Sequence, residues 1–228
     1  MDKFLIKFFR DRDKLDSFLD GMFWCNTPEF YRLEDAAGVG DKNESCVHSY
    51  RANRDGVGAT ITIEGLSPIE ITSSTWHNYS VKDRWMHCWF EWNLPKTDKD
   101  GIRLVEDINR MMSEFGNLYT VLLDRDISEF ISRVDKVTDL NFGANKVRYS
   151  TIREEWNSLC KDTRYAYQRE FRFLLGECSA SEVEPQKIYI SKGFRDIVLD
   201  CPPISMKDEN TNELLFELTT DGCKTSLK

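Results

Sequence analysis

The stretch from Tyr165 to Leu175 constrains the fold more than any other part of the chain, because its apolar and polar residues alternate. A period of two is typical of a β-strand, whose successive side chains point to opposite faces. The stretch therefore predicts a strand with two different faces. The mostly aromatic face consists of Tyr165, Tyr167, Arg169, Phe171 and Phe173. The polar face consists of Gln168, Glu170 and Arg172. The polar face is either a structural Glu170–Arg172 pair or a site that holds a carboxylate beside an amide and a guanidinium.

The composition is that of an ordinary globular protein, with 40% hydrophobic and 31% charged residues. The 228 residues suffice for one sizeable core, and no linker divides them, so we expect a single domain over residues 1–228. The net charge of −8 argues against a general nucleic-acid coat, since such binding rests on neutralising phosphates. It leaves open an enzyme that handles a nucleic acid through a local basic groove.

The seven cysteines are widely spaced and include no Cys-x-x-Cys pair, which predicts reduced thiols and no structural zinc site. The opening Met1–Arg10 is too charged for the apolar core of a secretion signal. No stretch approaches the ~18 apolar residues that a membrane span requires. We therefore expect a cytoplasmic protein that has no membrane partner.

Short strands and short helices alternate irregularly, without βαβ repetition, which favours the α+β class. We expect a split, mainly antiparallel sheet with short flanking helices. Apolar runs and alternation predict strands at residues 3–10, 22–25, 59–64, 69–72, 85–92, 119–123, 145–150, 165–175, 187–190, 196–199 and 214–218. Helical periodicity and capping signals predict helices at residues 14–19, with Asp13 as the N-cap, and at 101–115, 127–134 and 151–159. Pro28 is expected to open a turn or a short helix with Phe30, Tyr31 and Leu33 on one face.

The segment from Glu34 to Glu44 is acidic and contains two glycines, which is typical of a loop. Its four carboxylates suggest a cation site, but the spacing of a calcium-binding loop is absent. Acidic loops are more often simply solvated. We expect this loop to be exposed and free of metal.

Three pieces of the sequence resemble the ADP-ribosyltransferase superfamily: Arg10 at the end of the first strand, Asn26-Thr27 at the end of the second, and Gln168-x-Glu170 on a late strand. In arginine-type members a basic residue on the first strand contacts the NAD phosphate or ribose. A short polar strand follows it, and a late Gln/Glu-x-Glu strand carries the catalytic glutamate. The resemblance implies an ADP-ribosyltransferase-like fold, with Arg10, Asn26 and Thr27 binding NAD as a substrate and with Glu170 and Gln168 as catalytic residues.

The implied reaction breaks the nicotinamide–ribose bond and builds a cation at the ribose, which a fixed carboxylate stabilises. Glu170 would supply that carboxylate, and Gln168 would orient the nucleophile. A planar guanidinium such as that of Arg10 suits a pyrophosphate. Tyr31 or Trp24 would stack on the nicotinamide ring.

The chain is also similar to a broad bacterial family of uncharacterised proteins found near phage-defence and mobile-element genes. The similar segments are Phe23–Pro28, Asp41–Glu44, Cys88-Trp89, Lys146–Tyr149 and Tyr167-x-x-Glu170-x-Arg172. Together the two resemblances imply a toxin or phage-defence effector that modifies a nucleic acid or a protein. They also leave room for a cognate antitoxin as a partner.

Two other functions fit the same residues. A metal-dependent nuclease would use Asp41, Glu44 and Glu170 with a nearby lysine to hold Mg²⁺ for phosphodiester cleavage. A non-catalytic sensor or interaction module of a defence system would keep Glu170 and Arg172 as a structural pair.

Overall fold

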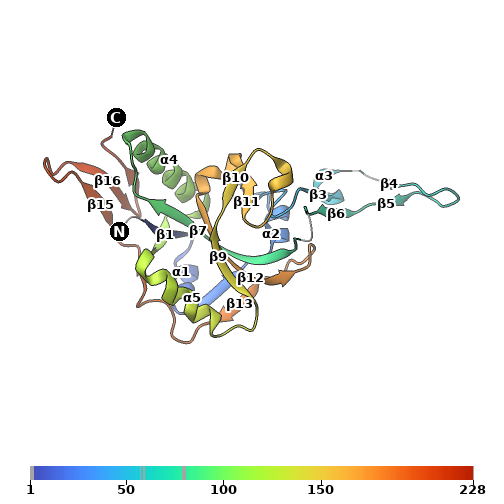
Figure 1. Cartoon of the computed structure of the whole chain (residues 1–228), viewed down its shortest axis with the longest axis horizontal. Helices are drawn as coiled ribbons and strands as arrows, with labels where there is room; N and C mark the ends of the chain where they lie inside the picture. The colour runs from blue at the N-terminus through green and yellow to red at the C-terminus, as the bar shows by residue number, and fades with distance from the viewer. Residues whose placement is uncertain (1–2, 57, 59, 79–80, 228) are drawn as a thin grey trace.

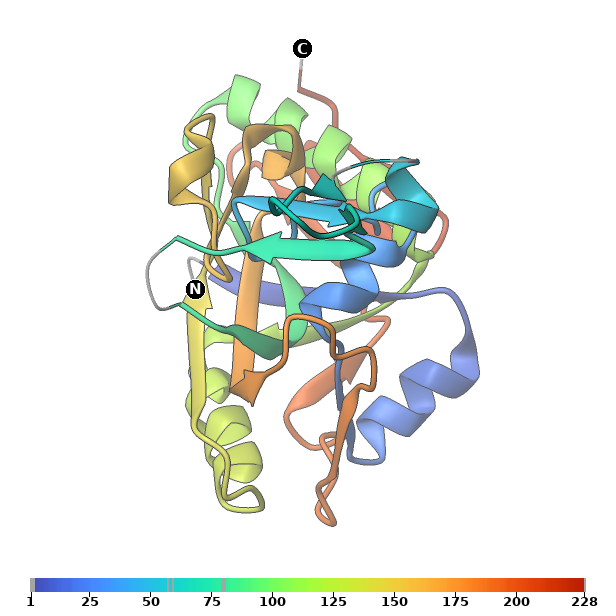
Figure 2. The ribbon, with the colours of Figure 1, turned by 90° about the vertical axis from the view of Figure 1, so that its right-hand side faces the viewer.

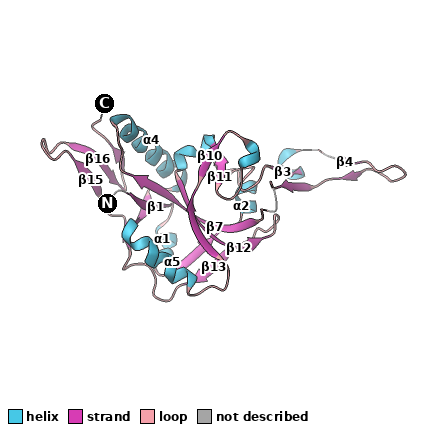
Figure 3. Cartoon of the chain, in the orientation of Figure 1, coloured by secondary structure: helices cyan, strands magenta, loops and turns pink. Residues whose placement is uncertain are grey.

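The computed structural model describes residues 3–56, 58, 60–78 and 81–227. The fold is α+β, with mostly antiparallel strand pairs and a few, mainly short, helices (Figure 1 and Figure 3). This confirms the predicted α+β class with mainly antiparallel strands. The first residue of the strand expected at residues 59–64 lies outside the described residues.

A six-stranded antiparallel sheet forms the centre of the molecule. Its strands, in spatial order, are β14 (Val198–Asp200), β8 (Leu118–Leu123), β1 (Lys3–Phe9), β7 (Asp83–Asn93), β12 (Glu170–Cys178) and β9 (Phe142–Lys146). The apolar run expected at residues 85–92 is therefore confirmed as a central strand, since β7 lies between β1 and β12.

Two apolar layers cover the main sheet, one on each face. Figure 2 shows the long helix of residues 98–115 toward the top of the ribbon and the helices of residues 12–19 and 127–135 toward its bottom. Helices α1 (Arg12–Leu19) and α5 (Ile127–Asp135) pack on the face that carries Trp89 and Phe173. Helix α4 (Asp98–Phe115) packs on the opposite face, beside a small sheet. The small sheet consists of β15 (Ile204–Lys207), β16 (Leu214–Thr219) and β17 (Gly222–Lys224).

One edge of β7 is shared by two chain segments, and a gap lies between them. Strand β1 pairs with β7 only as far as Ile6 opposite Phe90. Beyond the gap, Asn26 forms backbone hydrogen bonds in both directions with Met86, at 2.9 and 2.7 Å. Asn26 follows strand β2 (Met22–Cys25), which pairs with β13 (Gln186–Tyr189) in a separate two-stranded sheet. The backbone of β7 between Met86 and Phe90 therefore faces an opening.

The remaining elements surround this opening or extend away from it. They are α2 (Pro28–Leu33), β3 (His48–Arg51) paired with β6 (Ser73–Trp76), α3 (Ala52–Asp55), β4 (Thr60–Ile61) paired with β5 (Ile69–Glu70), β10 (Arg148–Ser150) paired in parallel with β11 (Cys160–Asp162), and the 3₁₀ turns η1 (Asp124–Asp126), η2 (Arg153–Glu155) and η3 (Thr163–Gln168). The β4–β5 hairpin projects far from the rest of the chain (Figure 1).

The predicted strand at residues 165–175 is wrong in its first part. Thr163–Gln168 forms the 3₁₀ turn η3, and the strand begins only at Glu170. Asp162 caps the turn by accepting a hydrogen bond from the Arg164 amide, and Arg169 adopts a left-handed conformation with φ of 42°. A capped turn therefore replaces the alternating strand geometry before Glu170.

Two helix predictions and one strand prediction also need correction. The first helix begins at Arg12 and is capped by Asp11, because Asp11 rather than Asp13 accepts the Lys14 amide. The segment 151–159 contains only the turn η2, because the Asn157 side chain bonds to local backbone instead of allowing a helix. The strand expected at 145–150 is divided between β9 and β10.

Helix α2 confirms that Pro28 opens a helix, but its apolar face is not the buried one. Phe30 and Leu33 are exposed, whereas Glu29 and Arg32 are buried. The reason is an internal ion-pair network, in which Arg32 pairs with Asp83 at 2.8 Å and Glu29 pairs with Arg51. Buried charges are stable only when they are paired in this way.

Candidate functional site

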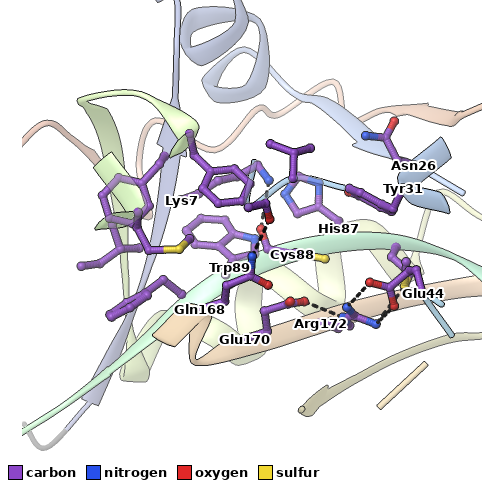
Figure 4. Close-up of a pocket in the computed structure, with 18 of the residues that line it drawn as sticks. Lys7, Asn26, Tyr31, Glu44, His87, Cys88, Trp89, Gln168, Glu170 and Arg172 are labelled. Atoms are coloured by element: carbon purple, nitrogen blue, oxygen red, sulfur yellow. Dashed lines mark hydrogen bonds and ion pairs between the residues drawn. The ribbon is translucent and has the colours of Figure 1, made fainter. Parts of the chain in front are cut away.

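The opening at the edge of β7 is the mouth of a pocket, which we call the edge pocket (Figure 4). Five consecutive β7 residues, from Met86 to Phe90, line it. Successive strand residues point to opposite faces, so five in a row can share one cavity only where it opens along the edge of the strand. The volume of the cavity is about 140 Å³.

The other walls come from segments far apart in the sequence. Strand β1 contributes Ile6, Lys7 and Phe8, and helix α4 contributes Met111 and Phe115. The polar wall consists of Glu44, Lys161, Gln168, Glu170 and Arg172. The edge pocket thus combines apolar and aromatic surface with a small number of convergent polar groups, which is the usual composition of a ligand site.

The carboxylate of Glu170 is held by two cations. Lys161 Nζ donates a hydrogen bond to Glu170 Oε1 at 2.7 Å, and Arg172 Nε donates to Oε2 at 2.6 Å. The Arg172 guanidinium also donates to both oxygens of Glu44, at 2.8 and 3.0 Å. Lys161 Nζ lies 3.2 Å from Glu44 and 4.0 Å from Asp41. These five buried residues form what we call the ionic cluster.

Strand geometry explains the positions of two of the five residues in the ionic cluster. Glu170 and Arg172 are two residues apart on β12, so they share a face, and they lie opposite Phe90 and Cys88 of β7. The other members arrive from loop and edge segments, since Lys161 lies on β11 and Glu44 lies in the turn before β3. Removing any one charge would leave a buried partner uncompensated.

The cluster fixes the ionisation of its members. Burial favours the neutral form of Glu170, but Arg172 and Lys161 outweigh burial and lower the pKa of this carboxyl. Burial likewise opposes the charge of Lys161, yet Glu170 and Glu44 hold its pKa well above the usual value. For Asp41 burial prevails and raises the pKa to about 6. With three carboxylates and two cations, the ionic cluster carries a formal charge of −1 above about pH 6 and is neutral below it.

Gln168 closes one side of the edge pocket. Its Oε1 accepts a hydrogen bond from Lys161 Nζ at 3.0 Å, and its Nε2 donates to the carbonyl of Gly38 at 2.6 Å. Tyr165 donates to the carbonyl of Gly40 at 3.0 Å. Side chains of η3 therefore hold the 34–44 segment against the pocket.

The structure brings together five of the seven residues that the sequence singled out for a site. They are Trp24, Asn26, Tyr31, Gln168 and Glu170, all of which line the edge pocket. Gln168 and Glu170 do so from different elements, since Gln168 ends η3 and Glu170 begins β12.

Arg10 and Thr27 do not line the edge pocket. Arg10 follows the end of β1, and its guanidinium donates to the Glu114 carbonyl at 2.7 Å near the end of α4. Thr27 is fully buried, and its hydroxyl caps α2 by accepting the Phe30 amide at 3.0 Å. Its role in the structure is that of an N-cap.

The expectation of an exposed acidic loop is wrong for its C-terminal part. Asp41 and Glu44 are 4% and 1% exposed, because they join the ionic cluster. The cluster thus contains all three carboxylates of the nuclease alternative and a lysine. The cations Lys161 and Arg172 occupy the space between these carboxylates, and no group of three or more His, Cys, Asp or Glu side chains in the described ranges could hold a metal.

Lys7 and Lys161 are pocket residues that the sequence analysis missed. Lys7 interrupts an apolar strand, which is a signal for a buried or functional cation. Lys161 lies in a short segment without periodicity, so no local pattern distinguishes it from a surface lysine.

Within the described part of the chain, no helix has the length and apolar character needed to cross a membrane. Comparison of the sequence with protein-family models finds no match, and comparison with curated proteins and with solved structures finds none either.

Proposed function

We propose that the protein binds NAD in the edge pocket and transfers its ADP-ribose to an acceptor, with Glu170 as the catalytic carboxylate. The observation that carries this proposal is a carboxylate kept ionised by Lys161 and Arg172 at the wall of a pocket with aromatic surface. Glu170 stands on a central strand, which holds a catalytic group more precisely than a loop does.

The reaction breaks the bond between ribose C1′ and the nicotinamide nitrogen, and the electron pair leaves with nicotinamide. A lone pair of the acceptor then forms the new bond to C1′, and the acceptor proton passes to solvent. Positive charge develops on the ribose between these events. Each Glu170 oxygen accepts one hydrogen bond from a cation, so each keeps a further lone pair that can accept a hydrogen bond from a ribose hydroxyl. The net charge of the ionic cluster favours the developing cation.

The residues present fit NAD with one change of role. Arg10 lies outside the pocket lining, and the basic residue of the first strand that lines the pocket is Lys7. Lys7 therefore replaces Arg10 as the first-strand cation that contacts the bound NAD. Trp24 is 46% exposed at the pocket, and together with Tyr31 it offers a ring surface for stacking. A cavity of about 140 Å³ suits a single ring, so the rest of the dinucleotide would extend outside it.

The acceptor is a nucleic acid or a protein, and modification of either accounts for a toxin or phage-defence effector. The test is to incubate the purified protein with NAD and bacterial protein or nucleic acid, and to measure nicotinamide release and ADP-ribose adducts by mass spectrometry. Glu170→Gln should lower the rate of nicotinamide release by ~10²–10³. Glu177→Gln is the matched control, because Glu177 lies on the same strand but is exposed.

The second candidate is a non-catalytic binding module, and one observation favours it. Both oxygens of Glu170 are already hydrogen-bonded, so the ionic cluster is satisfied without a ligand. This function predicts no nicotinamide release by the wild-type protein. Release that is equal in wild type and in a folded Glu170→Gln variant would contradict the transferase mechanism.

A further inference from the structure

Three nitrogen-bearing side chains that do not belong to the ionic cluster also line the edge pocket (Figure 4). They are Lys7, His87 and Trp89, and we call them the edge subsite. His87 and Trp89 share one face of β7, with ring centroids 6.0 Å apart. Lys7 follows Ile6, the last β1 residue paired with β7, and continuation of that register would put it opposite Trp89.

The hydrogen bonds of His87 define its tautomer. His87 Nδ1 lies 2.7 Å from the Trp24 carbonyl oxygen, which can only accept, so Nδ1 carries the proton. Burial and then Lys7 hold the pKa of His87 well below its usual value, so the ring is neutral. Nε2 is therefore a lone-pair acceptor, and it has no hydrogen-bond partner among the described residues.

Among the residues that the structure describes, Trp89 lacks a hydrogen-bond acceptor, whereas His87 lacks a donor. Its Nε1–H is a donor, the side chain is 2% exposed, and no acceptor lies within reach in the described structure. Lys7 Nζ donates to the Cys88 carbonyl at 3.0 Å, which leaves two of its ammonium hydrogens for other partners. Buried polar groups in native proteins normally have partners, so this set indicates that a ligand group completes it.

The donors and the acceptor of the edge subsite determine which ligand group fits it. A carboxylate or phosphate only accepts hydrogen bonds, so it would satisfy Trp89 and Lys7 but would oppose the lone pair of His87 Nε2. A primary carboxamide provides an acceptor oxygen and a donor NH₂ in one plane. We propose that the edge subsite binds the primary carboxamide of an aromatic ligand, with its oxygen on Trp89 and Lys7 and its NH₂ on His87. Identification of that ligand with the nicotinamide of NAD rests on the proposed function.

The direct test compares two molecules that differ only in this group. Nicotinamide and nicotinate share the pyridine ring and carry a carboxamide and a carboxylate respectively. Titration calorimetry on the full chain should show nicotinamide binding at least about tenfold more tightly, since one buried polar group without a partner has an effect of this order. Equal affinities, or tighter binding of nicotinate, would overturn the proposal.

Trp89→Phe removes the indole N–H and keeps an aromatic ring, and it should weaken nicotinamide binding about five- to tenfold. Trp92→Phe is the matched control, because Trp92 lies on the same strand, is buried, and also has an Nε1 without a described partner, but does not line the edge pocket. Its affinity for nicotinamide should equal that of wild type. Lys7→Met provides an independent variant if Trp89→Phe does not fold. Unchanged binding in a folded edge-subsite variant, or equal losses in the Trp89 and Trp92 variants, would contradict the proposal.

The result also separates this inference from the proposed function. Selective nicotinamide binding without NAD cleavage would support the edge subsite and count against the transferase. NAD cleavage with no preference between nicotinamide and nicotinate would support the transferase and reject the edge subsite.

Discussion

Gln168 and Glu170 accept hydrogen bonds from the same ammonium group, that of Lys161, at 3.0 and 2.7 Å. The two residues belong to different elements, and the left-handed Arg169 between them turns the chain from η3 into β12. Lys161 therefore bridges the amide and the carboxylate in the edge pocket. The catalytic proposal depends on this cation as much as on Glu170.

Replacement of Lys161 by Met should strongly destabilise the protein. Among the described residues, the substitution leaves Glu170 and Glu44 with Arg172 as their only close cation, and breaking a buried pair typically costs ~3–5 kcal/mol. Urea denaturation measures the free energy of unfolding. Lys82→Met is the control, because Lys82 and Glu177 form an exposed pair on the surface, and such pairs contribute little. Similar losses in the two variants would show that the cluster is not a stabilising unit.

Activity should fall as the pH drops through about 6. Asp41 has a pKa raised to about 6, above all by burial, and its protonation removes the net negative charge of the ionic cluster. Rates of nicotinamide release between pH 5 and 8 test this expectation. Asp41→Asn should flatten the profile in that window, and a wild-type rate that is constant across pH 6 would contradict it.

Protonation of Asp41 should have the opposite effect on stability: it lowers activity but stabilises the fold. A raised pKa means that the folded protein binds the Asp41 proton more tightly than the unfolded chain does. The contribution of Asp41 to the free energy of unfolding should therefore decrease as the pH rises from about 4 to about 6, and stay constant above that. Denaturation of wild type and Asp41→Asn over this range measures the difference. If the stability of wild type relative to Asp41→Asn instead increased with rising pH, the raised pKa would not belong to Asp41.

Gly38→Ala should loosen the 34–44 segment. Gly38 has a φ of 75°, and an added Cβ would lie 1.8 Å from a carboxylate oxygen of Glu114, which is itself held by Tyr167 at 2.6 Å. Strain of this kind costs about 1–3 kcal/mol. Urea denaturation should show that loss, whereas Gly143→Ala should show little change, because its Cβ would meet nothing within 4 Å. Wild-type stability of Gly38→Ala would mean that the segment adapts freely.

A chelator should leave activity unchanged. The oxygens of Glu44 and Glu170 already bond to Arg172 and Lys161, so a metal ion would have to displace both cations. The measurement is nicotinamide release before and after treatment with EDTA. Loss of activity that Mg²⁺ restores, or metal-dependent nucleic-acid degradation, would instead favour the nuclease alternative with Asp41, Glu44 and Glu170.

The sequence predicted the elements whose apolar pattern is long. The central strand around Trp85–Trp92 and the helix around residues 101–115 were both found, because many residues report the same period. The common face of Glu170 and Arg172 followed from their spacing on a strand. Residues 165–168 were misassigned because four alternating residues also fit a capped 3₁₀ turn.

The site was only partly predictable. The resemblance indicated five residues that line the pocket, but the pairing of Glu170 with Lys161 depends on β11 reaching β12 through η3, and no local pattern records that approach. Burial of Asp41 and Glu44 escaped prediction for the same reason, since their cations come from residues more than a hundred positions away. The sequence shows Lys7 as a charge within an apolar strand. Its place in the pocket follows only from the structure, in which β1 and Asn26 share the edge of β7.

The edge pocket has a consequence for biosynthesis. Its lining runs from Ile6 to Arg172, and its first-strand wall is made early while Glu170 and Arg172 are made late. A nascent chain that has not yet released Arg172 from the ribosome therefore has no complete pocket. Any activity that resides there begins only when most of the chain has been synthesised and folded.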